Sequence, residues 1–114
     1  LLEDALARDR KVFLSPNVPL VRDMTSLAQV EVGLKKYPEA EALLKEATIA
    51  LGKTGVAPDH QAYADVGEVY VTVLLKTGRS DEARAMADSV VAAFKGKPAI
   101  QAKFEKLRSL AAGQ

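Results

Sequence analysis

The stretch Tyr37-Pro38-Glu39-Ala40 returns later in the chain as Ser80-Asp81-Glu82-Ala83, at an offset of 43 residues (80 − 37). Pro38 suits the first turn of a helix, where its missing N–H costs no hydrogen bond, and an acidic residue follows in that turn in both copies. Further upstream, Pro16-Asn17 matches Pro58-Asp59 at an offset of 42 (58 − 16), so a loop has changed length by one residue. The chain therefore contains two copies of one segment. In each copy, the two recurring motifs mark the starts of two helices that a tight turn joins.

The apolar residues between these landmarks follow the period of a helix, and aromatic residues make up only 5% of the chain. Gly52 is expected to end one helix, and Ser80 is expected to cap another. In the second helix the expected apolar face is Leu20, Met24, Leu27, Ala28 and Leu34. The pattern predicts an all-α fold with short antiparallel connections and six helices, at about residues 1–13, 18–36, 38–51, 59–77, 81–95 and 98–111.

The composition excludes several classes of function. Among 114 residues, 16 Lys and Arg balance 15 Asp and Glu, so nucleic acid is not an expected partner. The absence of Cys excludes disulfides and thiolate metal sites, and His60 alone cannot build a histidine zinc site. No apolar run approaches the roughly 18 residues that a membrane span needs. We expect no cofactor and no membrane span, and a cytoplasmic location is favoured.

The small and large residues of the two copies resemble the tetratricopeptide repeat. The long period and the Pro-Asn or Pro-Asp start are similar to the kinesin-light-chain-type variant of that family. Glu31, Lys35 and Gly67 depart from the family pattern, because an aromatic residue, a glycine and a larger residue are usual there. The matching positions are Met24, Leu27, Ala28, Tyr37, Ala40, Leu44 and Ala47 in one unit, and Gly67, Tyr70, Val71, Gly78, Ala83, Ala87 and Val90 or Val91 in the other.

The resemblance implies a short right-handed α-solenoid of antiparallel hairpins, cut from a longer array. Residues 1–13 would then be the second helix of a truncated repeat, residues 17–52 and 58–95 two repeats, and residues 98–112 a capping helix with a polar outer side. The alternative is an ordinary six-helix bundle. An exposed cut end would favour self-association through the face of Leu1, Leu2 and Leu6.

The resemblance also implies a non-catalytic module that binds a peptide or a partner protein on its concave face. The face combines acidic Asp65 and Glu68 with apolar Val32 and Leu75, which suits a basic or amphipathic segment better than a C-terminal carboxylate. The positions carried over from the family are Arg22, Thr25, Gln29, Val32 and Gly33 in the first unit and Asp65, Glu68, Thr72, Leu75 and Lys76 in the second.

Other functions stay open at this stage. The chain could be a regulatory or scaffolding repeat domain of a larger enzyme, such as a bacterial signalling kinase. Asp65 and Glu68 could act as an acid–base pair, but no nucleophile accompanies them. Gly52-Lys53-Thr54 lacks the preceding glycine of a phosphate loop, and His60 is expected to be a helix cap or loop contact. The basic C-terminal residues lack the aromatic platform of a nucleic-acid site; they are Lys95, Lys97, Lys103, Lys106 and Arg108.

Overall fold

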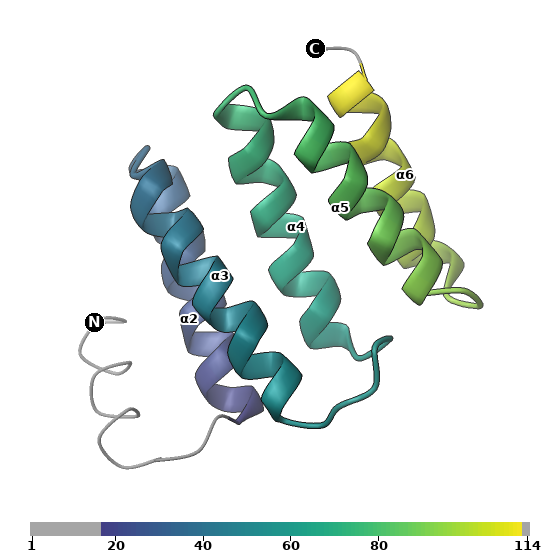
Figure 1. Ribbon diagram of the computed structural model, residues 1–114, viewed down its shortest axis with the longest axis horizontal. Helices are drawn as coiled ribbons and strands as arrows, with labels where there is room; N and C mark the ends of the chain where they lie inside the picture. Colours follow the sequence, from purple (N-terminus) through teal and green to yellow (C-terminus); the bar gives the residue numbers. More distant parts are fainter. Residues whose placement is uncertain (1–16, 113–114) are drawn as a thin grey trace. The chain divides into compact units, whose positions relative to one another are not determined.

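The computed structural model describes residues 17–112, and in this part of the chain it contains five α-helices and no strand (Figure 1). The all-α prediction is confirmed for these residues. The helix predicted at residues 1–13, with its Leu1, Leu2 and Leu6 face, lies outside them. The helices are α2 (Val18–Gly33), α3 (Tyr37–Lys53), α4 (Gln61–Lys76), α5 (Ser80–Ala93) and α6 (Pro98–Ala112).

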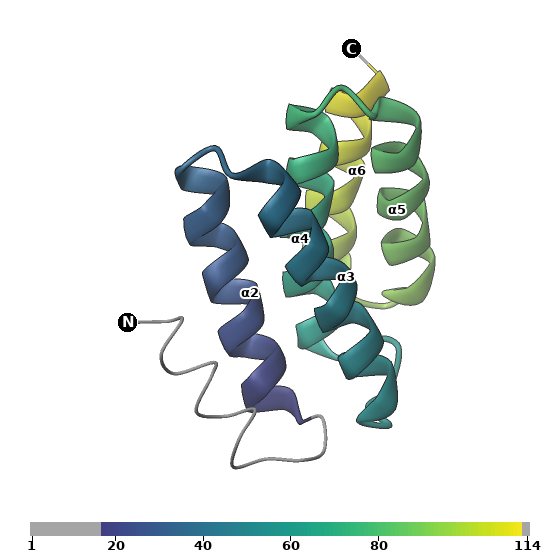
Figure 2. The ribbon, with the colours of Figure 1, turned by 60° about the vertical axis from the view of Figure 1, so that its left-hand side comes forward.

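The chain divides between Ala57 and Pro58 into two compact units. The N-terminal unit contains the hairpin of α2 and α3, and the C-terminal unit contains the hairpin of α4 and α5 followed by α6. Short turns make neighbouring helices antiparallel within each unit. In the C-terminal unit α6 packs along α5 and also contacts α4 (Figure 2).

The hairpin of the N-terminal unit is built on small residues where its helices approach and on larger ones beside them. Ala28 of α2 and both Ala40 and Ala47 of α3 are completely buried, which lets the two backbones come close. Met24 and Leu44 are equally inaccessible and fill the space beside the alanines. The small-and-large pattern that the sequence suggested is therefore a packing pattern in this hairpin.

The core of the C-terminal unit joins three helices. Phe94, at the end of α5, and Phe104, in the middle of α6, are fully buried. A Cβ atom at Gly67 of α4 would lie 3.2 Å from Val90 Cγ2 and 3.5 Å from the Phe104 ring. The missing side chain at Gly67, which departs from the family pattern, therefore makes room for α5 and α6.

Several predicted helix boundaries are wrong by a few residues. Gly52 lies inside α3, which continues to Lys53, and the glycine with left-handed backbone after this helix is Gly55 (φ 77°). Ser80 is the first residue of α5 and not its cap, because the cap position belongs to Arg79. Helix α2 ends at Gly33 rather than near residue 36, so Leu34 falls in the turn and is 62% exposed instead of part of the apolar face.

Candidate partner-binding face

The turn between α2 and α3 has a defined hydrogen-bonding pattern. The amide of Lys36 donates to the carbonyl of Glu31 (2.8 Å), and the amide of Lys35 donates to that of Val32 (3.0 Å). Lys35 itself adopts left-handed backbone (φ 61°), the conformation that closes a helix in this type of turn. A lysine therefore occupies a position where glycine has the lower backbone energy.

The turn between α4 and α5 repeats this pattern 43 residues later. The amide of Arg79 donates to the carbonyl of Leu74 (2.8 Å), and the amide of Gly78 donates to that of Leu75 (3.3 Å). Gly78 stands where the first turn has Lys35 and has the same left-handed backbone (φ 75°). The two hairpins thus share one turn geometry, although one uses lysine and the other glycine.

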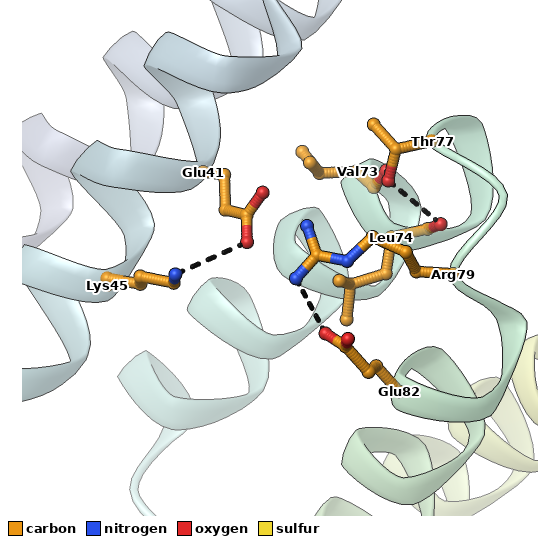
Figure 3. A network of polar contacts seen from close by, with 7 residues as sticks. All are labelled: Glu41, Lys45, Val73, Leu74, Thr77, Arg79 and Glu82. Atoms are coloured by element: carbon orange, nitrogen blue, oxygen red, sulfur yellow. Dashed lines mark hydrogen bonds and ion pairs between the residues drawn. The ribbon is translucent and has the colours of Figure 1, made fainter.

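In the turn between α4 and α5, side chains form further hydrogen bonds and an ion pair, as Figure 3 shows. The Thr77 hydroxyl donates to the carbonyl of Val73 (2.9 Å) and also lies 3.2 Å from that of Leu74. Arg79 pairs with Glu82 in the first turn of α5 (2.6 Å). Thr77 thus bonds back to the end of α4, and Arg79 bonds forward to the start of α5. In the N-terminal unit, a separate ion pair joins Lys45 to Glu41 along α3 (3.5 Å).

The helix starts show that the 43-residue offset holds across the hairpin. Asn17 caps α2 by accepting a hydrogen bond from the amide of Leu20 (2.8 Å), because Pro19 has no N–H to offer. The residue that caps α4 is His60, 43 positions after Asn17 (60 − 17). The match of Asn17 with Asp59 is therefore wrong by one residue, and the extra residue lies between Pro58 and His60.

The residues predicted for the partner-binding face differ in accessibility. Thr25 is buried, and its hydroxyl donates to the carbonyl of Val21 (2.8 Å), so it has no free hydroxyl to offer a partner. The Thr72 hydroxyl also bonds back to its own helix, at the carbonyl of Glu68 (2.9 Å). The exposed residues of the set are Arg22, Gln29, Gly33 and Lys76, and the half-buried ones are Val32, Asp65, Glu68, Thr72 and Leu75.

The acidic part of the predicted face already has partners within the C-terminal unit. Lys103 of α6 forms an ion pair with Glu68 (3.1 Å), and the Gln61 amide donates to Asp65 (3.0 Å). The side chains of Lys103 and Glu68 are 55% and 45% exposed, so the pair lies at the surface. The sequence did not indicate Lys103 as part of this region, because a pairing across 35 residues leaves no local pattern.

Other polar contacts attach α6 and its preceding loop to the rest of the C-terminal unit. Lys97 donates to the carbonyl of Asp59 (2.7 Å) and lies 3.6 Å from its carboxylate. Arg108 bonds to Asp88 on α5 (2.9 Å), and this hydrogen bond, with the charge of Asp88, raises the pKa of Arg108 above its usual value.

The residues considered for a phosphate loop lie at the end of a helix. Gly52 and Lys53 form the end of α3, and the Thr54 hydroxyl donates to the carbonyl of Leu51 (2.7 Å), an ordinary helix end. No group of three His, Asp or Glu side chains in this part of the chain is placed to hold a metal ion. None of its helices is both long and apolar enough to cross a membrane.

Comparison of the chain with protein-family models, with curated proteins and with solved structures finds no match.

Proposed function

We propose that the chain is a non-catalytic protein-binding module built from tetratricopeptide-like hairpins that stack as a short right-handed solenoid. The observation that carries this proposal is the turn shared by the two hairpins, with matching hydrogen bonds at Lys36 and Arg79 and left-handed backbone at Lys35 and Gly78. Stacked arrays are built from repeated hairpins, and these hairpins share the geometry of their turn.

Helix α6 fits the role of a cap in this proposal. It covers the α4–α5 hairpin with the buried Phe104 and turns exposed Glu105 and Lys106 outward. A terminal helix with one apolar and one polar side closes an array that would otherwise expose its core.

The chemistry of the face favours a partner that brings basic or apolar groups. Asp65 and Glu68 supply negative charge, and half-buried Val32 and Leu75 supply apolar area. Since Lys103 already pairs with Glu68, a basic side chain of the partner would compete with an internal lysine. We expect the negative charge of Asp65 and Glu68 to affect which partner binds more than how tightly it binds.

The proposal is tested by quantitative affinity capture with the whole chain as bait. We compare the natural sequence with the double variant Asp65→Asn/Glu68→Gln, which removes both charges without placing a second cation beside Lys103. The matched control is Glu46→Gln/Glu105→Gln, which changes exposed carboxylates outside the predicted face.

A partner that binds this face is expected to be retained by the control and depleted about two- to fivefold by the face variant, since an exposed ionic contact contributes about 0.5–1 kcal/mol. Titration calorimetry with the purified partner then gives the change in Kd. Equal recovery with both variants, at unchanged circular dichroism, would contradict the assignment of the face.

A further inference from the structure

The cap of α4 is the side chain of His60, the one histidine of the chain. Its Nδ1 atom accepts a hydrogen bond from the amide of Ala62 (3.0 Å), while its carbonyl accepts one from the amide of Tyr63 (3.0 Å). An imidazole nitrogen accepts a hydrogen bond only when it carries no proton. The capped state therefore holds a neutral ring, with its proton on Nε2.

Protonation of this ring removes the cap in two ways. Nδ1 becomes a donor that faces the Ala62 amide, another donor, so the hydrogen bond is lost. The ring also acquires a positive charge at the helix end whose free amides already carry partial positive charge. Both effects oppose the capped conformation of a protonated His60.

Charged side chains lie near the cap on both sides of His60 in the chain. Asp59, next to His60 in the chain, is held by Lys97 from the α5–α6 loop through its carbonyl (2.7 Å) and its carboxylate (3.6 Å). Asp65, one turn into α4, accepts from Gln61 (3.0 Å). A carboxylate next to the cap in the sequence is thus in contact with an ammonium group.

The N-terminal unit supplies a cap that cannot titrate. Asn17 holds the matching position on α2 and accepts from the amide of Leu20 (2.8 Å) through its side-chain oxygen. An amide side chain keeps its acceptor at every physiological pH. The chain therefore carries one titratable and one permanent cap at equivalent places in its two hairpins.

We propose that His60 is a pH-sensitive cap. When its ring takes up a proton, the hydrogen bond from the Ala62 amide is lost and the first turn of α4 opens, whereas Asn17 keeps its hydrogen bond at the start of α2. The released turn begins three residues after the boundary between the two units, at Ala57–Pro58. Acidification would thus lengthen the segment that joins the units and loosen the contact of Lys97 with the carbonyl of Asp59.

The test follows backbone amide exchange by nuclear magnetic resonance between pH 7.5 and 5.5, with each rate divided by the intrinsic rate at the same pH. The whole chain is compared with His60→Asn, which installs the residue that caps α2. For the natural sequence, we expect protection of the amides of Ala62 and Tyr63 to fall about fivefold on acidification, the effect of losing a helix cap. Protection at Leu20 is expected to stay constant.

In His60→Asn, protection at all three amides is expected to be independent of pH. The nitrogen shifts of the His60 ring supply a second measurement, which is expected to show the Nε2–H tautomer at pH 7.5. The proposal is overturned if Ala62 and Tyr63 lose protection equally in the two proteins, if they lose none in either, or if the neutral ring carries its proton on Nδ1.

Discussion

At the scale of single residues, the two hairpin turns show that one backbone geometry can be occupied by unlike side chains. Lys35 and Gly78 both have positive φ, at 61° and 75°. Left-handed backbone costs a residue with a Cβ atom about 1–2 kcal/mol, and the greater freedom of glycine in the unfolded chain returns part of that difference. The backbone of Lys35 is therefore strained in the turn between α2 and α3.

The first prediction concerns this pair of residues. Lys35→Gly is expected to raise the free energy of unfolding by about 0.5–1 kcal/mol because it relieves the strained backbone. Gly78→Lys is expected to lower it by a similar amount, since a Cβ atom there meets no neighbour and only the backbone conformation opposes it. Urea denaturation followed by circular dichroism measures both changes, and two shifts of the same sign would contradict the argument.

At the scale of secondary-structure elements, the sequence predicts the helices well and their ends less well. Pro38 and the buried alanines near it follow local rules, and α3 and its packing agree with them. Gly52 misleads because glycine in a helix costs only about 1 kcal/mol, which the buried Leu51 beside it offsets. A helix can therefore end at a glycine, but it can also continue past one, as α3 does at Gly52.

The predicted face illustrates what local patterns cannot supply. Glu68 was expected to be open to a basic partner, but its neighbour Lys103 comes from a helix 35 residues away. The buried hydroxyl of Thr25 is equally hidden from the sequence, because a helical threonine can bond its own backbone or face a partner. Knowing which helix faces contact each other requires the tertiary structure.

The second prediction compares two glycines that both lie inside helices. Gly67→Val is expected to lower the free energy of unfolding by about 1–3 kcal/mol, because Val90 and Phe104 occupy the space that the new side chain needs. Gly52→Val is expected to leave it unchanged or raise it by a few tenths of a kcal/mol, since nothing lies within 4 Å of a Cβ atom there. Thermal melts of both variants measure the difference, and a Gly67→Val protein as stable as the natural one would show that α6 does not pack tightly on α4.

A third prediction separates charge from packing where α6 meets the hairpin. The ion pair of Lys103 with Glu68 is half exposed, so Lys103→Gln is expected to cost less than about 1 kcal/mol, and nothing measurable in 1 M salt. The adjacent Phe104 is fully buried, so Phe104→Ala is expected to cost about 3–5 kcal/mol at any salt concentration. Urea titrations at low and high salt test both expectations, and a large salt-resistant loss for Lys103→Gln would assign the ion pair a structural role.

At the scale of the whole molecule, the division at Ala57–Pro58 places α4, α5 and α6 together in one compact unit. Its three helices share the buried Phe94 and Phe104, and ion pairs link α6 and its loop to the rest of the unit. Domains of about 55–65 residues can fold alone when such a core is present, although their stability is small.

The final prediction is that residues 58–114, produced alone, stay helical and unfold cooperatively. Circular dichroism gives the helical content, and calorimetry tests whether unfolding is a single transition. The matched control is the same fragment with Phe104→Ala, for which the expected loss of about 3–5 kcal/mol exceeds what so small a core can spare. A natural fragment that melts as gradually as this control would mean that the C-terminal unit depends on the preceding hairpin. Cooperative melting of the natural fragment alone would show that residues 58–114 carry their own fold.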